Sequence, residues 1–258
     1  MRKLISIDIK ADFGMLKNPD TNEPVYLTFN MLHKPALLGI FGAIIGLKGF
    51  QKKGELPEYY DKLKNLKIGI QPLNHENGNY SKTIIKYNNT TGFASEEKGG
   101  NLIIDEQTLI APAFRCYVLL NLDNENQKKL YNNLKDNKAE YLPYLGKNEF
   151  SVWWENFNNY DFGEFSAEGI FKISSIFIKE ESLKKGIKKI YFTPKMNFQS
   201  QNKFFSYFEN LPVSYHKKLF QYEYKNFTFT NWDLKNDFKL PENYPLIKLS
   251  TNEIIQVF

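Results

Sequence analysis

The chain has 258 residues, of which 42% are hydrophobic and 24% charged, so its composition excludes a disordered or fibrous protein. Its 34 basic and 29 acidic residues give a formal net charge of +5, which favours a polyanionic partner such as nucleic acid. Cys116 is the single cysteine in the sequence, which excludes an internal disulfide and argues against a cysteine-based metal site.

Neither the N-terminus nor the longest apolar run predicts membrane insertion. The first ten residues read as a β-strand rather than a signal peptide, because no uninterrupted apolar stretch follows the charges. The longest apolar run, residues 35–47, is shorter than the roughly 20 residues that a membrane-spanning helix needs. We therefore expect a soluble cytoplasmic protein without a membrane partner.

The first elements alternate between strand and helix. Apolar residues occupy the odd positions from Ile5 to Phe13 and polar residues the even ones up to Asp12, which predicts a half-buried strand. A short strand is expected at 25–29, and Lys34-Pro35 begins a helix that extends to about Leu47. Small residues at helical spacing predict close packing against this helix; they are Gly39, Gly42, Ala43 and Gly46.

The next segment predicts a strand, a protruding hairpin and a second strand. Leu66 to Ile70 reads as a strand. The segment 77–110 contains two short β-prone pieces, residues 83–87 and 102–104, separated by a polar, Gly-containing stretch. This pattern predicts a long hairpin, or thumb. The continuous apolar run from Phe114 to Leu122 is typical of a central strand.

An amphipathic helix and a further strand complete the first half. Asn124 and Gln127 form a capping-box-like start for a helix that ends near Lys135. A short strand near 139–142 would complete a βαββαβ unit, the ferredoxin-like fold of RRM proteins, over residues 1–145. The fold class is thus α+β. Residues 146–258 are expected to form a smaller, mostly-β region that packs on the first domain, with strands at 169–178, 189–192, 204–208, 219–230 and 247–258.

The sequence lacks the usual signatures of nucleotide and metal sites. The phosphate-loop pattern G-x-x-x-x-G-K-[ST] is absent. His33, His75 and His216 lie far apart without a histidine four residues away or a neighbouring cysteine. We therefore expect no metal and no cofactor.

Two segments are candidates for anion or base binding. His33 and Lys34 precede a helix, whose free N–H groups and dipole can bind a phosphate. Alternatively, Asn30 and His33 only cap the helix and Lys34 is solvated.

In the second segment, Lys147 and Asn148 follow Gly146 and lie between Tyr144 and Phe150, an arrangement suited to stacking a base and holding a phosphate. A plain surface turn is the alternative interpretation of this loop.

Four segments of the chain resemble one known family. They are Ile7-Asp-Ile-Lys-Ala-Asp-Phe13, Asn30-Met-Leu-His-Lys-Pro-Ala-Leu-Leu-Gly-Ile40, Arg115-Cys-Tyr-Val118 and Tyr144-Leu-Gly-Lys-Asn148. With these segments the sequence resembles the RAMP-type CRISPR-associated proteins of family five, and is most similar to the type I-B branch. The resemblance covers roughly residues 3 to 155, whereas the C-terminal third is similar only in length and strand content.

The resemblance implies a ferredoxin-like RAMP domain with a thumb, acting as a non-catalytic subunit of a type I Cascade complex in antiviral defence. Its partners would be the five-prime handle of the guide RNA (crRNA), the large subunit and the first backbone subunit, with target DNA met indirectly through the complex. The RNA-binding role would fall on Asn30, His33, Lys34, Arg115, Tyr144, Lys147 and Asn148. Asn148 departs from the family pattern, in which basic residues follow the glycine.

Two other functions remain open at this point. In the related type I-C branch the same scaffold cuts the guide precursor, and His33, Lys34 and Tyr26 would then be the nearest acid and base groups. We find no fuller grouping of this kind and expect no catalytic residues. The second alternative is a general RNA-binding protein unconnected with CRISPR.

Overall fold

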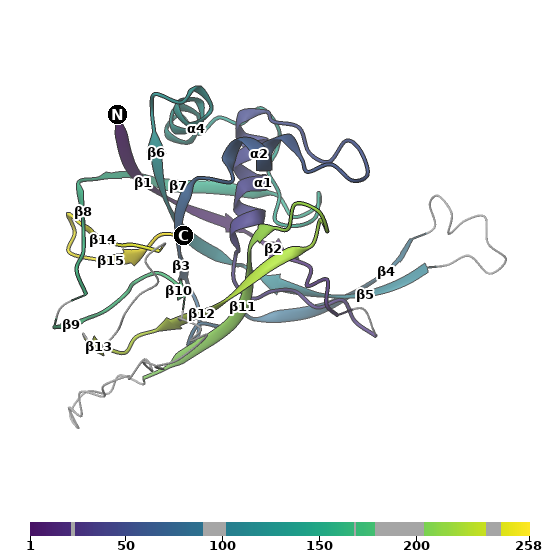
Figure 1. Cartoon of the computed structure of the whole chain (residues 1–258). Coiled ribbons are helices and arrows are strands. Elements are labelled where there is room, and N and C mark those ends of the chain that lie inside the picture. The colour runs from purple at the N-terminus through teal and green to yellow at the C-terminus, as the bar shows by residue number, and fades with distance from the viewer. Residues whose placement is uncertain (22–23, 90–101, 168, 179–203, 236–243) are drawn as a thin grey trace.

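The structure of the chain is a computed structural model (Figure 1). It describes residues 1–21, 24–89, 102–167, 169–178, 204–235 and 244–258. Within these ranges no helix is long and apolar enough to cross a membrane.

A four-stranded antiparallel sheet forms the centre of the first half. Its strands, in spatial order, are β3 (Lys67–Leu73), β6 (Ala113–Asn121), β1 (Arg2–Ala11) and β7 (Val152–Tyr160). Helix α1 (Lys34–Ile45) follows β1, and helix α4 (Glu125–Lys135) follows β6. This connectivity and strand order are those of the ferredoxin-like βαββαβ unit, so the predicted fold class is confirmed.

The fourth strand lies later in the chain than we predicted. Residues 139–142 form no strand; instead the N–H groups of Glu140 and Tyr141 donate to the carbonyls of Ile44 and Ala43. These carbonyls belong to the last turn of α1, where backbone acceptors lack helical partners, so this segment caps the helix. The sheet continues to Tyr160, beyond residue 145, where we placed the end of the first domain.

Two further local predictions need correction. Residues 25–29 form no continuous strand. They make only isolated β-bridges, from Tyr26 to Glu106 and from Thr28 to Lys17. A short helix, α2 (Glu58–Leu63), follows α1 and was not predicted. It packs Tyr59 against the small residues of α1, which confirms that Gly39 and Gly42 serve packing.

Side-chain alternation along β1 divides the sheet into two faces. Ile5, Ile7 and Ile9 are buried against α1 and α4 in the main hydrophobic core. Leu4 points to the opposite face, where it packs with Tyr117 and the C-terminal strands β14 (Leu246–Leu249) and β15 (Ile254–Gln256). Both faces of the sheet are therefore covered over part of their area.

The predicted thumb is present as a two-stranded hairpin. Strands β4 (Lys82–Asn89) and β5 (Leu102–Ile110) pair antiparallel from Lys82–Leu109 to Asn89–Leu102 and project away from the body (Figure 1). The short strand β2 (Phe13–Gly14) pairs with the base of β5. Of the predicted polar tip, Asn88 to Gly100, only Asn88 and Asn89 lie among the described residues.

The rest of the described chain is mostly β. Its remaining strands are β8 (Phe162–Glu164), β9 (Ile170–Phe171), β10 (Phe177–Ile178), β11 (Ser206–Tyr215), β12 (Tyr222–Thr230) and β13 (Leu234–Lys235). The hairpin β11–β12 contributes Leu211, Phe227 and Phe229 to the same hydrophobic core as α1. Residues 189–192, predicted as a strand, lie outside the described residues.

The glycines of α1 provide a test of this packing. A Cβ on Gly42 would lie 2.4 Å from Tyr59 Cβ, whereas one on Gly39 would lie 3.7 Å from the Tyr59 ring, which is an ordinary contact. Gly42→Ala should therefore lower the free energy of unfolding by about 1–3 kcal/mol. Gly39→Ala should be neutral or stabilising by up to about 1 kcal/mol, because alanine favours helix. Urea unfolding measures both, and an equally stable Gly42→Ala protein would contradict this packing.

Candidate nucleic-acid interface

Helix α1 begins with His33 as its N-cap. The backbone of His33 is extended, and its Nδ1 accepts the N–H of Ala36 at 3.3 Å. The ring is 3% exposed and makes edge contacts with Phe29 and Tyr222. The capping alternative for His33 is therefore the one observed.

Burial keeps the His33 ring neutral. Loss of solvation lowers the pKa of His33 to about 3, so the imidazole is uncharged at neutral pH. Because Nδ1 accepts a hydrogen bond, the proton of the neutral ring lies on Nε2. His33 can therefore donate a hydrogen bond but supplies no positive charge for a phosphate at this helix start.

Asn30 does not cap the helix but joins three parts of the chain. Its side-chain amide donates to the carbonyl of Gly78, and its Oδ1 accepts from Tyr80 N and from Lys82 Nζ. Its own N–H donates to the carboxylate of Glu209 at 2.8 Å. At 3% exposure, Asn30 is placed to fix the thumb base rather than to contact a ligand.

Lys34 is also turned into the protein. It is 8% exposed, and its Nζ donates to the backbone oxygen of Phe258 at 3.0 Å. Burial, with a smaller effect from the charge of Lys67, lowers the pKa of Lys34 to about 8. Its ammonium thus makes an internal hydrogen bond. Neither a phosphate-binding Lys34 nor a solvated one is observed.

The loop around Gly146 lies against the chain segment that follows β2. Met15 N donates to Leu145 O at 3.1 Å, and Gly146 has a φ of 87°. A Cβ on Gly146 would fall 1.8 Å from the carbonyl oxygen of Met15, so only glycine fits. This close approach holds in place the loop that carries Tyr144 and Lys147.

Lys147 connects this loop to the base of the thumb. Its Nζ lies 2.7 Å from Glu106 of β5 and 3.1 Å from Glu149. Asn148 is exposed beside it. The Lys147 side chain is 20% exposed, so a phosphate that bound its ammonium would compete with these two carboxylates.

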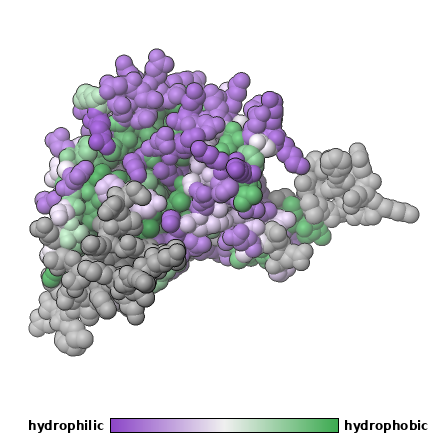
Figure 2. Space-filling view, in the orientation of Figure 1, coloured by the Kyte–Doolittle hydropathy of each residue, from purple (hydrophilic) through white to green (hydrophobic). Residues whose placement is uncertain are grey.

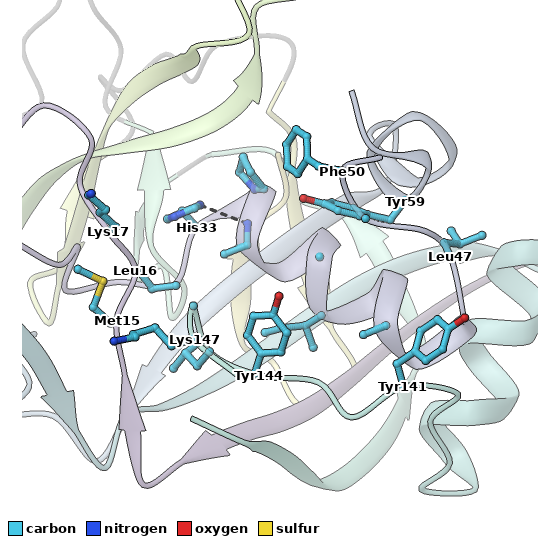
Figure 3. A pocket seen from close by; sticks show the side chains of 18 of the residues that line it. Met15, Leu16, Lys17, His33, Leu47, Phe50, Tyr59, Tyr141, Tyr144 and Lys147 are labelled. Carbon is cyan, nitrogen blue, oxygen red and sulfur yellow. Dashed lines mark hydrogen bonds between the residues drawn. The ribbon is translucent and has the colours of Figure 1, made fainter. Parts of the chain in front are cut away.

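A cleft of about 720 Å³ lies between α1, this loop and the end of the β11–β12 hairpin. Three of the predicted residues, His33, Tyr144 and Lys147, line it. Figure 3 shows Tyr141 and Tyr144 projecting from one side of the cleft, and Phe50 and Tyr59 from the other. The floor is the α1 surface around Gly39 and Ala43, where small side chains leave room.

Aromatic rings dominate the walls of the cleft. They are Phe50, Tyr59, Tyr141, Tyr144, Tyr215 and Tyr222. Tyr215 and Tyr222 stack on each other with ring centres 4.9 Å apart. Burial raises the pKa of Tyr59 to about 12, so its hydroxyl stays protonated and can donate. Tyr141 and Tyr144 are 58% and 44% exposed, which leaves their faces open to a ligand.

Lysines supply positive charge along the same cleft. Lys17 and Lys48 lie at its border, together with the partly exposed Lys147. The Lys17 ammonium lies 3.6 Å above the ring of Tyr26. Aromatic faces combined with lysines are the arrangement by which proteins bind single-stranded nucleic acid, through base stacking and phosphate neutralisation.

Arg115 does not belong to the cleft. It points to the sheet face opposite α1, where its Nε and a terminal nitrogen donate to the two carboxylate oxygens of Asp8 at 2.7 and 2.9 Å. Burial raises the pKa of Asp8, but the hydrogen bonds from Arg115 and Asn156 outweigh it and lower the value overall. Of the predicted residues, Arg115, Asn30 and Lys34 are thus held in internal contacts, and Asn148 is exposed but does not line the cleft either.

The sequence did not indicate most of the cleft's rings. Phe50, Tyr59, Tyr215 and Tyr222 come from the segments around α2 and β11–β12, where no sequence pattern pointed to a ligand. The one available signal was the aromatic content of 16%, which we could not assign to positions. Such rings converge through tertiary packing, which a periodicity argument cannot show.

The sequence matches no protein-family model and no curated protein. Solved structures do resemble the chain. One is the crystal structure of a CRISPR protein from Archaeoglobus fulgidus, which is 14% identical and has a TM-score of 0.51. The alignment covers 100% of this chain and 98% of that one. The two chains share a fold.

A chain of a CRISPR RNA-guided surveillance complex is also similar, at 11% identity and a TM-score of 0.48. That alignment covers 92% of this chain and 94% of the other. The shared fold includes the C-terminal strands as well as the ferredoxin-like unit, because the Archaeoglobus alignment spans the full length.

The neutral state of His33 predicts an acid-dependent loss of stability. Below its ordinary pKa of 6.5 the unfolded chain binds a proton that the folded chain excludes until about pH 3. Stability should therefore fall as the pH drops from 6.5, by up to about 1.4 kcal/mol per pH unit from this residue. His33→Asn keeps a capping acceptor but does not titrate.

Urea unfolding between pH 7.5 and 4.5 measures this contribution. The variant should show a shallower loss of stability with acid than the wild type does. The lost ring contacts with Phe29 and Tyr222 should lower the stability of the variant by the same amount at every pH. The test is therefore the slope of the free energy of unfolding against pH. Equal slopes would mean that His33 becomes protonated in the folded protein.

Proposed function

We propose that this chain is a non-catalytic RNA-binding subunit of a CRISPR ribonucleoprotein complex and that it holds single-stranded guide RNA in the cleft beside α1. The observation that carries the proposal is the combination of six aromatic rings with Lys17, Lys48 and Lys147 around one cleft. The fold shared with a CRISPR protein supports the assignment to this system.

Different residues of the cleft would contact the bases and the phosphates of the RNA. Tyr144 and Tyr141 offer exposed faces on which unstacked bases can lie, while Lys17, Lys48 and Lys147 neutralise the backbone. A lysine ammonium is a point charge without the planar fork that discriminates base edges, so it would position the RNA without reading its sequence. The neutral His33 lines the same cleft but adds no positive charge to that of the lysines.

The finer assignment follows from the four sequence segments that resemble the family. We propose a family-five subunit of a type I-B-like Cascade that holds the five-prime handle of the guide RNA. Its protein partners would be the large subunit and the first backbone subunit. The thumb strands β4 and β5 project from the body and would contact the latter. Target DNA would meet the complex and not this chain directly.

In this role the chain would cleave no RNA. A metal-free ribonuclease needs a base that accepts the 2′-hydroxyl proton and an acid or cation near the phosphate. His33 is buried and uses Nδ1 for the helix cap, while Lys34 donates to Phe258 inside the protein. Neither group is presented to a scissile phosphate.

Fluorescence anisotropy tests the binding. The protein should bind handle RNA more tightly than a scrambled oligonucleotide of the same length, and both affinities should fall as salt rises. Tyr144→Ala should lose about 1–3 kcal/mol of binding free energy, the typical contribution of one stacked base, and Tyr144→Phe should retain it.

Trp153→Ala is the matched control for the loss of an exposed aromatic ring. Trp153 is 43% exposed and pairs with Lys10, which places its ring on the sheet face opposite α1. RNA affinity should be unaffected by this change. Equal affinities for handle and scrambled RNA would favour a general RNA-binding protein, and no binding at all would remove the proposal.

A gel assay of precursor guide RNA tests the absence of cleavage. Incubated in EDTA, the purified chain should leave the precursor intact, because His33 and Lys34, two of its three candidate acid and base groups, are buried. Specific cutting at the base of the repeat hairpin that is abolished by His33→Ala would instead establish the endonuclease alternative.

A further inference from the structure

A second, smaller hollow adjoins the cleft. It measures about 340 Å³ and is lined by Phe50, Gln51, Lys52, Lys53, Gly54, Glu55 and Phe220. Phe50 and Gln51 also line the cleft, so the two depressions adjoin at these side chains. A chain that leaves the cleft at this end would enter the hollow.

Phe220 holds an unusual backbone position at the border of the hollow. It lies in the turn between β11 and β12 with a φ of 54°, which is unfavourable for a bulky side chain. The turn is held by His216, whose Nδ1 accepts from the N–H groups of Lys218 and Leu219 and whose carbonyl accepts from Phe220 N at 2.9 Å. The fold thus maintains a strained residue whose ring is 40% exposed.

Phe50 presents a second exposed ring to the same hollow. It is 59% exposed and makes an edge contact with Tyr215, at a distance of 6.4 Å between ring centres. Tyr215 belongs to the stacked pair that closes this end of the cleft. The aromatic surface of the cleft therefore extends through Phe50 to Phe220. Most of the surrounding helical side of the molecule is hydrophilic (Figure 2).

Positive charge accompanies these two rings. Lys52 and Lys53 line the hollow and are both exposed. Lys52 lies 3.4 Å from Glu55, but this pair is exposed, with 73% and 62% of the side chains accessible, so it contributes little and a phosphate can replace it. Apolar rings beside lysines suit a nucleotide better than an apolar peptide segment, which would gain nothing from the charges.

We propose that the hollow is a separate nucleotide subsite, which binds the nucleotide that follows the RNA segment in the cleft. Its base stacks on Phe50 and Phe220, and its phosphate lies near Lys52 and Lys53. This inference rests on the proposed function, because it extends the same RNA path. The subsite accepts any base, since stacking on phenylalanine does not depend on base-edge hydrogen bonds.

The experiment measures how affinity changes as RNA lengthens by one nucleotide at a time. Anisotropy is recorded for the full-length wild type and for Phe220→Ala with a ladder of single-stranded oligonucleotides that share the handle sequence and extend at either end. RNA that fills only the cleft should bind both proteins equally. Once the RNA reaches the hollow, the wild type should gain affinity and Phe220→Ala should bind about tenfold more weakly than the wild type.

Two control variants separate the ring from the turn. Phe220→Tyr keeps an aromatic face and should restore the gain on lengthening. Leu219→Ala removes an exposed apolar side chain, 62% accessible, from the same turn but not from the hollow, and should bind every oligonucleotide as the wild type does. With each of the four bases placed in turn at the added position, the gain in affinity should change little.

The outcomes distinguish this subsite from the proposed function. If the wild type binds the ladder and Phe220→Ala matches it at every length, the subsite is wrong while RNA binding in the cleft stands. If the wild type binds no member of the ladder, the proposed function itself fails, and the subsite with it. If Phe220→Ala binds RNA normally but no longer copurifies with partner subunits, the hollow is a protein contact and not a nucleotide site.

Discussion

The arrangement of the cleft depends on the hydrogen bonds made by Asn30, which is buried. It bonds to Gly78, Tyr80 and Lys82 at the base of the thumb, and its backbone N–H bonds to Glu209 on β11. Met31 N donates to the same carboxylate at 3.0 Å. Two residues later, His33 starts α1, the helix that forms the cleft floor. One short segment therefore positions the thumb, the C-terminal hairpin and the helix relative to one another.

Most of the ferredoxin-like unit could be predicted because its elements carry local signals. The alternation in β1, the Lys34-Pro35 helix start, the Asn124 cap and the apolar run of β6 each depend on a few neighbouring residues. The fourth strand was misplaced because β7 is an edge strand with mostly exposed residues and a β-bulge, so it lacks a regular alternation. The preceding loop, at 139–142, caps α1 through backbone–backbone hydrogen bonds. Such bonds do not depend on particular side chains, so the sequence gives no signal for them.

The candidate site was predictable only in part, for a related reason. Tyr144 and Lys147 lie in a loop whose glycine marks a close backbone approach, and the cleft does form there. Asn30, Lys34 and Arg115 are polar residues that the fold uses internally, in contact with Gly78, Phe258 and Asp8 respectively. Sequence alone cannot tell a polar side chain that binds a ligand from one that satisfies a buried partner, because both uses require the same chemical groups.

The ion pair between Lys147 and Glu106 links occupancy of the cleft to the thumb. Glu106 is 7% exposed and lies on β5, so a phosphate that draws Lys147 away weakens one contact of a buried carboxylate at the thumb base. Binding of a phosphate would therefore weaken one contact that holds the thumb hairpin to the body. Because such coupling is reciprocal, a neighbouring protein that shifts β5 would alter how tightly the cleft holds its ligand. Under the proposed function, the thumb would therefore change the affinity of the cleft for RNA as well as contact a neighbouring subunit.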